Sequence, residues 1–284
     1  GTTFTNARAG DFIHIWQGGH HYIAEISSIT NNTTLVLVDA WPFPTATSAI
    51  TYLVFDPAKN SAVKDLTIEN SDDTTASLQI TRAVNFVAHN VTVYSNGGAG
   101  GNGIQLDTVF DSEFRNVRSD FHNDDGWQII DTAKTSFYNC SAVGNGGQGW
   151  DLASVGNSDQ LGFYSCISDA NTSRGFDLAG NNINFYNCRA AGNDDDGFAV
   201  IDSDRCLFHA CLGFDNAGDG IQVGPAVGND NNKNSVVGCT FIDNDAYGIR
   251  IGAQASETVI DDCKFSGNTS GTILDGGTTT FYRN

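Results

Sequence analysis

Long apolar runs, methionine and basic residues are what this 284-residue sequence lacks. No stretch is long and apolar enough for a transmembrane helix, so membrane insertion is not expected. Only 14 lysine and arginine residues stand against 33 acidic ones, and the net charge of −19 disfavours binding to nucleic acid or to an anionic membrane. No signal peptide opens the chain, and methionine is absent, so we expect a processed or excised chain.

What the sequence does contain is a repeat. An Asn is followed three or four residues later by Gly and a short apolar run, at Asn123, Asn145, Asn171, Asn193, Asn216, Asn244 and Asn268. Six cysteines follow at matching intervals, at Cys140, Cys166, Cys188, Cys211, Cys239 and Cys263. The apolar runs alternate strictly and are bounded by Gly, Asn and Asp, which indicates strands and excludes amphipathic helices. A repeat of this length indicates a solenoid.

The repeat predicts an all-β, right-handed parallel β-helix of about nine coils over residues 61–284, with about three strands in each coil. Like residues should stack about 4.8 Å apart along the axis. Two inward columns follow: Phe114, Phe137, Phe163, Phe185 and Phe208, and Trp127, Trp150, Phe176 and Phe198. We expect the Asn ladder to satisfy buried backbone groups and to adopt the left-handed conformation of a tight corner.

The cysteines are predicted to be free thiols. Stacked residues keep their Cβ atoms near the strand spacing of about 4.8 Å, beyond the roughly 3.5–4.5 Å that a disulfide prefers. Six thiols should point inward, and Cys206 lies outside their ladder.

Residues 1–60 do not follow the repeat. Four short strands are predicted at 11–16, 22–29, 34–38 and 50–55, separated by Gly, Asn and Pro turns. They predict a small antiparallel β barrel or cap that closes the N-terminal end of the solenoid or docks onto another protein.

The sequence segments 145–152 and 171–178 share the pattern Asn-x-x-x-Gly-aromatic-x-aliphatic. They resemble the coils of pectate-lyase-like β-helix proteins. That superfamily includes polysaccharide lyases, alginate epimerases and bacteriophage tailspikes. The resemblance covers residues 61–284 and implies a polysaccharide ligand. The module at 1–60 resembles the front of phage tailspike and receptor-binding proteins, which implies an extracellular or virion-surface location, virion attachment through this module and a trimer. The Asp-Pro-His-Glu motif expected of alginate epimerases is absent, which disfavours an epimerase.

Candidate catalytic residues follow from the stacking. Asp151 and Asp177 occupy equivalent outward positions on adjacent coils, so their carboxyl groups should lie about 5 Å apart, as in a retaining glycosidase. Mutual repulsion would raise the pKa of one of them. Arg174 would bind an anionic sugar or moderate that repulsion. The alternative is a solvated acidic stripe.

Candidate substrate-binding residues are the outward aromatic strip Tyr138, Tyr164, Tyr186 and His209, flanked by Arg115, together with Gln128. Aromatic rings receive the apolar face of sugar rings. The alternative is a ladder of cross-strand pairs that stabilises only the fold.

A calcium site is the third candidate. Two insertions, at 155–162 and 224–234, leave the same edge of the solenoid, and Asp159, Asp202, Asp204 and Asp230 face this region. Oxygen-rich turns suit calcium, which would bridge an acidic protein to an acidic polysaccharide, as the resemblance to pectate lyases implies. The alternative is acid-rich surface turns without a metal.

Three functions stay open at this stage. The first is a polysaccharide-directed tailspike or receptor-binding protein, with or without depolymerase activity. The second is a secreted polysaccharide lyase or glycosidase that uses Asp151 and Asp177. The third is a structural fibre or sheath subunit.

Overall fold

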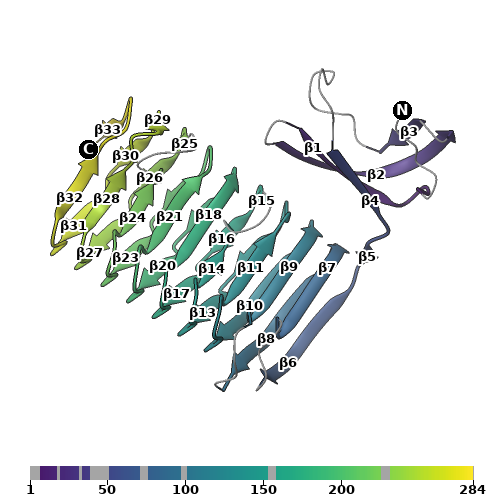
Figure 1. The fold of residues 1–284 in the computed structure, drawn as a ribbon, viewed down its shortest axis with the longest axis horizontal. Coiled ribbons are helices and arrows are strands. Elements are labelled where there is room, and N and C mark those ends of the chain that lie inside the picture. Colours follow the sequence, from purple (N-terminus) through teal and green to yellow (C-terminus); the bar gives the residue numbers. More distant parts are fainter. Residues whose placement is uncertain are drawn as a thin grey trace.

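The computed structural model describes residues 7–17, 20–31, 34–38, 51–70, 76–96, 101–152, 158–224 and 231–283. The regular elements in these ranges are strands, and none of the described residues forms a helix fit to cross a membrane. Parallel strands stack into a long solenoid, and a small antiparallel sheet lies near its N-terminal end (Figure 1). The expected parallel β-helix with a small antiparallel N-terminal sheet is confirmed.

One face of the solenoid, here called the first face, is an 11-stranded sheet. Its strands are β5 (Ala58–Lys59), β7 (Leu78–Val84), β9 (Ile104–Phe110), β11 (Trp127–Ile130), β14 (Trp150–Asp151), β15 (Ser158–Asp159), β18 (Phe176–Asn181), β21 (Phe198–Asp202), β24 (Ile221–Val223), β28 (Tyr247–Ile251) and β32 (Gly271–Asp275).

The other two faces belong to one 16-stranded sheet that bends at a corner. The long strands β6 (Ala62–Asn70), β8 (Val87–Ser95) and β10 (Glu113–Asp120) run through both faces, because the first half of β10 pairs with β12 and its second half with β13. The second face continues with β12 (Ser136–Tyr138), β16 (Gly162–Tyr164), β19 (Asn184–Tyr186), β22 (Leu207–His209), β26 (Ser235–Val237), β30 (Val259–Asp261) and β33 (Phe281–Arg283). The third face continues with β13 (Ser141–Val143), β17 (Ile167–Asp169), β20 (Arg189–Ala191), β23 (Leu212–Phe214), β27 (Thr240–Ile242) and β31 (Lys264–Ser266). Two short strands, β25 (Asn231–Asn232) and β29 (Ala255–Ser256), pair with each other.

The corner between the second and third faces requires one left-handed residue in each coil. Asn90, Asn116, Asn139 and Asn187 fill it in four coils, with φ between 51° and 54°. The Asn116 amide donates to Asn90 Oδ1 at 3.1 Å, so this corner also links neighbouring coils. Asparagine suits the position because its short polar side chain tolerates the left-handed region.

The predicted Asn ladder lies at a different corner, between the third and first faces. From Asn145 to Asn268, each amide donates to the Oδ1 atom of the next ladder Asn at 2.8–2.9 Å, and that Oδ1 atom also accepts the preceding ladder residue's backbone N–H. The ladder residues Asn145, Asn171, Asn193, Asn216, Asn244 and Asn268 are not among the positive-φ residues, so the expected left-handed conformation is wrong for them. The prediction that Asn123 belongs to the Asn ladder is wrong. His122 occupies the ladder position in that coil, because its backbone N–H donates to Asn145 Oδ1. Asn123 itself is exposed.

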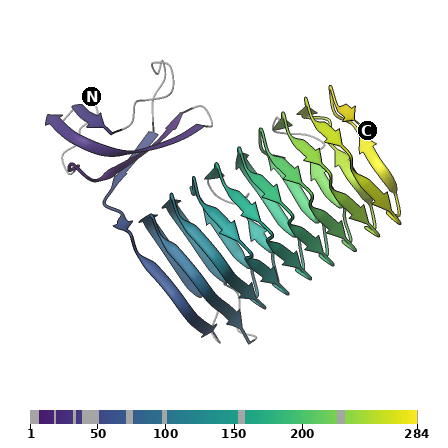
Figure 2. The same ribbon diagram turned by 180° about the vertical axis from the view of Figure 1, so that it is seen from behind.

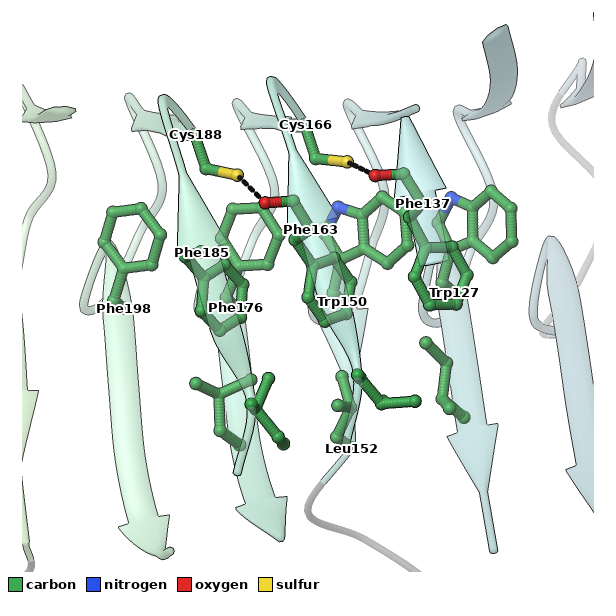
Figure 3. Close-up of a cluster of buried hydrophobic side chains, with 14 of the residues drawn as sticks. Trp127, Phe137, Trp150, Leu152, Phe163, Cys166, Phe176, Phe185, Cys188 and Phe198 are labelled. Atoms are coloured by element: carbon green, nitrogen blue, oxygen red, sulfur yellow. Dashed lines mark hydrogen bonds between the residues drawn. The ribbon is translucent and has the colours of Figure 1, made fainter. Parts of the chain in front are cut away.

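The two aromatic columns form the core as predicted. Neighbouring Phe rings of the second face stack with centroids 4.6–5.1 Å apart from Phe114 to Phe208. Trp127 and Trp150 stack at 4.6 Å, and each meets the Phe column edge to face (Figure 3). Offset stacking along a column and edge contacts between columns are the arrangements that aromatic quadrupoles favour.

The seven cysteines are free, as predicted. In the Cys ladder each thiol donates to a backbone carbonyl of the preceding coil; Cys166 Sγ, for example, lies 3.4 Å from the carbonyl oxygen of Phe137 (Figure 3). Burial raises the pKa of the Cys166 and Cys188 thiols well above the usual value, so these thiols are neutral. Cys206, which lies outside the ladder, is buried too.

The N-terminal module is an open sheet. Its strands are β1 (Phe12–Gln17), β2 (His20–Asn31), β3 (Thr34–Leu37) and β4 (Thr51–Phe55), in the order β3-β2-β1-β4. The four predicted strands are confirmed, and among the described residues they form an open sheet with β3 and β4 at its edges, not a barrel.

The module is attached to the side of the first coils. Phe12 packs against Val84 and Phe110, at the ends of β7 and β9, and Lys59 Nζ donates to the Gly10 carbonyl at 2.5 Å. The end strand β6 pairs only with β8 among the described strands, and its Leu66 is 41% exposed. Figures 1 and 2 show β6 uncovered at the end of the stack. The expected closure of this end is therefore wrong.

Candidate active site

Two carboxyl groups lie next to each other on the outer side of the first face. Asp151 on β14 and Asp177 on β18 are register partners in the parallel sheet, as the repeat predicts. One strand spacing of about 4.8 Å separates their backbones. Asp151 is 2% exposed and Asp177 4%, so the alternative of a solvated acidic stripe is wrong. Because both carboxyl groups are buried away from solvent, their pKa values depend on the neighbouring protein groups.

A second row of polar side chains runs beside this pair. It occupies the position immediately before the repeated Gly and consists of Asp125, Gln148, Arg174, Asp196 and Asp219. The carboxylates in it bind the next coil: Asp125 Oδ1 accepts the backbone N–H of Gln148 at 2.8 Å, and Asp196 Oδ1 accepts that of Asp219 at 2.7 Å. A Cβ atom on the neighbouring Gly149 would collide with Ser168 Oγ, so this Gly is required by close packing.

Asp125 is the proton-holding member of the cluster. Burial, followed by the charge of Asp151, raises its pKa to about 8, although the Gln148 N–H bond acts in the opposite direction. A hydrogen bond to Asp151 adds to the rise. At neutral pH Asp125 therefore keeps its proton.

Arg174 lies between the carboxyl groups on the other side. Its Nη1 atom donates to Asp177 Oδ2 at 3.1 Å, and its Nε atom lies 3.4 Å from Asp195 Oδ2 and 3.9 Å from Asp196 Oδ2. Of the two predicted roles, the geometry matches moderation of charge. Burial still raises the pKa of Asp177, and Arg174 offsets part of that rise.

The cluster extends by two more coils. Burial raises the pKa of Asp196 to about 7, against the opposing Asp219 N–H bond. Asp219 Oδ2 lies 2.5 Å from Nε of Arg250, and its Oδ1 atom accepts the backbone N–H of Tyr247. The sequence analysis missed Asp125, Asp196 and Asp219, although the same repeat carried the signal one residue before each Gly. The row of Asp151 and Asp177 continues toward the N-terminal coils with Gln128. Gln128 is the register partner of Asp151 and is half-buried.

The predicted aromatic strip is present on the second face. Tyr138 and Tyr164 stack at 4.7 Å, Tyr164 and Tyr186 at 5.4 Å, and His209 is tilted against Tyr186 at 5.9 Å. The Arg115 guanidinium lies 4.1 Å from the Tyr138 ring centroid and pairs with Glu113. Because the ring faces cover one another, the strip presents mainly edges and hydroxyl groups. This geometry fits the stabilising ladder, and the sugar-binding role of these residues stays a prediction.

The predicted calcium ligands do not converge in the part of the chain that the structure describes. Asp159 Oδ1 accepts the Asn182 amide at 2.8 Å, and Asp204 Oδ1 accepts the backbone N–H of Asn232 at 2.7 Å. These carboxylates link neighbouring coils. Asp230 and the side chain of Asp202 lie outside the described residues. The described residues contain no group of three or more His, Cys, Asp or Glu arranged for a metal ion, so we derive no calcium chemistry.

Comparison with known proteins identifies the architecture. Residues 150–284 match the family described as "Right handed beta helix region". The match and the stacked parallel strands agree on a right-handed parallel β-helix. This β-helix is similar to the mannuronan C-5 epimerase AlgE4 A-module of Azotobacter vinelandii, with a TM-score of 0.62 and 17% identity over 76% of the chain. It is also similar to the enzymatically active domain of bacteriophage CBA120 tailspike protein 2, with a TM-score of 0.60 and 13% identity over 80% of the chain.

A third similar β-helix is the catalytic unit of a GH87 α-1,3-glucanase from Streptomyces thermodiastaticus, with a TM-score of 0.56 and 10% identity over 80% of the chain. The chain spans 64% of the epimerase module, 40% of the tailspike domain and 48% of the glucanase unit. No curated protein sequence matches it. At these identities the likeness establishes the fold, and the chemistry has to be argued from the site.

Proposed function

We propose that this chain acts on a polysaccharide and hydrolyses its glycosidic bonds at the carboxyl cluster of the first face. The observation that carries the proposal is the buried register pair of Asp151 and Asp177, with Arg174 bound to Asp177 and Asp125, whose pKa is raised to about 8, beside Asp151. A proton donor and a carboxylate about 5 Å apart are what retaining hydrolysis requires. The titles of the similar structures name a mannuronan epimerase, a tailspike and a glucanase, which supports a polysaccharide as the ligand.

Each residue has a role in this proposal. Asp125, held beside Asp151, passes its proton to the glycosidic oxygen as the bond to the anomeric carbon breaks, while Asp177 attacks that carbon. Water then displaces Asp177, and its proton returns to Asp125. Arg174 orients Asp177 and favours its ionised form. The sugar approaches from the open side of the cluster, where the side chains of Arg174 and Asp195 are 26% and 47% exposed.

The test is a panel of polysaccharides whose products are analysed by mass spectrometry. Hydrolysis adds one water to each cleaved bond, whereas a lyase yields unsaturated ends of lower mass. Asp151→Asn and Asp177→Asn are each expected to lower the rate by roughly 10³-fold with the fold retained. Asp107→Asn is the matched control, because Asp107 lies on β9 of the same face, outside the cluster. Unchanged activity in both cluster variants would remove the carboxyl pair as the active site.

A second candidate is a receptor-binding protein of tailspike type that holds a polysaccharide without cleaving it. The near-complete burial of Asp151 and Asp177 favours it. It would place the protein outside the cell or on a virion, as a trimer attached through residues 1–60. Retention of a glycan without products, together with a trimeric mass by light scattering, would support this candidate over the first.

A further inference from the structure

The third face carries a cavity of about 350 Å³ that has no part in the carboxyl cluster. It opens on β10, β13, β17 and β20, which are neighbouring strands of that face. Its lining consists of Asn116, Arg118, Asn139, Ser141, Val143, Ile167, Asp169 and Arg189. The volume lies within the usual range for a site that holds a small organic molecule or a few sugar units.

The stacking register explains the shape of this cavity. Arg118, Ser141, Ile167 and Arg189 are consecutive register partners, so the two arginines stand three coils apart. The small side chain of Ser141 leaves space between them. An ion pair closes each end: Arg118 binds Asp120, and Arg189 binds Asp169. The result is a groove along the solenoid axis. Its floor lies between the two arginines, and an ion pair stands at each end.

The lining selects the chemistry of a ligand. An anion would meet a carboxylate beside each guanidinium in a chain of net charge −19, and a cation would meet a guanidinium at each end. Hydroxyl groups find donors in the guanidinium and Asn139 amide groups and acceptors in Asp169 and Ser141. Val143 and Ile167 provide an apolar middle for C–H ring faces. A neutral saccharide matches all three features.

We propose that this groove binds a neutral oligosaccharide along the solenoid axis, as a site separate from the carboxyl cluster. The proposal rests on the geometry of the third face and does not require that the first face hydrolyses anything. A binding site on one face and a reactive site on another would keep a long polysaccharide attached to the protein between encounters with the first face.

The test is binding of an array of neutral and acidic oligosaccharides to the Asp151→Asn protein, followed by titration calorimetry of the best neutral ligand. Ser141→Trp fills the groove and is expected to weaken that binding at least 10-fold. Thr240→Trp is the matched control: Thr240 lies in the same row of the third face, is half-buried like Ser141, and is outside the cavity. Arg189→Ala, the loss of an exposed side chain, is expected to weaken binding in the same direction.

Several outcomes would overturn the groove as a saccharide site. These are absence of binding to every neutral glycan, binding of acidic glycans alone, and equal affinities in wild type, Ser141→Trp and Arg189→Ala. If Ser141→Trp does not fold, the affinity of Arg189→Ala for the neutral ligand decides whether the groove binds it. Binding that depends on Ser141 while the wild-type chain releases no product would support the groove and count against the hydrolysis proposed for the first face.

Discussion

Asp125 and Asp151 are neighbours on the outer face of the solenoid, and after burial the charge and hydrogen bonding of Asp151 raise the pKa of Asp125. Two carboxyl groups share a hydrogen bond only when one of them holds a proton. Burial already favours the neutral form of Asp125, whose pKa is about 8. The pair therefore links the protonation of the protein to its stability.

Stability is expected to fall as the pH rises from about 4 to 8. The usual Asp pKa of about 3.8 applies to the unfolded chain, and the folded value for Asp125 is about 8, so in this window the folded state binds more protons. Asp196, at about 7, acts in the same direction. Over this window we expect a loss of unfolding free energy on the order of 2 kcal/mol. Urea unfolding at a series of pH values measures it.

Asp125→Asn should flatten this dependence. The Asn amide can donate permanently to Asp151, and its Oδ1 atom can keep the bond to the Gln148 N–H. Above pH 8 the variant is therefore expected to be more stable than wild type by on the order of 1–2 kcal/mol. Identical pH profiles for the two proteins would contradict the assignment of the proton to this pair.

The cysteine ladder should resist thiol reagents in the folded protein. Cys166 and Cys188 are buried, and burial raises their pKa, so the reactive thiolate is scarce. A hydrogen bond with Cys239, followed by burial, raises the pKa of Cys263 as well, but this thiol is only partly buried, so we expect it to react first with iodoacetamide through its greater access to the reagent. Mass mapping in native buffer and in guanidinium chloride gives the comparison. Rapid native labelling of Cys166 would show that the interior column opens far more readily than its packing indicates.

Tyr164→Ala is expected to lower the unfolding free energy by about 1–3 kcal/mol, because Tyr138 and Tyr186 each lose the ring that stacks between them. His209→Ala, at the tilted and exposed end of the strip, should cost less. Denaturant unfolding measures both. Glycan affinity in the same variant tests the predicted sugar-binding role: a clear loss of affinity would support it, and an unchanged affinity would leave the strip with a stabilising role alone.

The period of the repeat was enough to predict which residues stack. It placed Asp151 beside Asp177, and Trp127 on Trp150, because in-register coils repeat every side-chain position. It could not predict that Asp151 would be almost inaccessible, since burial of an outward side chain depends on what crosses the face from other coils. For a related reason, spacing does not show that the Asp159 carboxylate accepts a hydrogen bond from the Asn182 amide of the next coil.

The position of the N-terminal module could not be predicted from the sequence pattern either. Its four strands follow from local alternation and turns, but its position depends on Phe12 contacting Val84 and Phe110, which lie far along the chain. Neither contact leaves a periodic signal. The same limit explains the choice of Asn123 over His122, because two neighbouring polar residues fit the repeat spacing almost equally well.

Asn193→Ala compared with Asn123→Ala tests the corrected ladder directly. Asn193 Oδ1 accepts the backbone N–H and the amide of Asn171, and its own amide donates to Ser168 and Asn216, all within a buried corner. Its loss leaves several buried polar groups unsatisfied, so we expect a cost of about 2–4 kcal/mol in urea unfolding. Asn123 is exposed, and its replacement should change stability by less than about 0.5 kcal/mol. If Asn123→Ala proved as costly as Asn193→Ala, the Asn would belong to the ladder after all, and His122 would not be the residue that holds the first coil to Asn145.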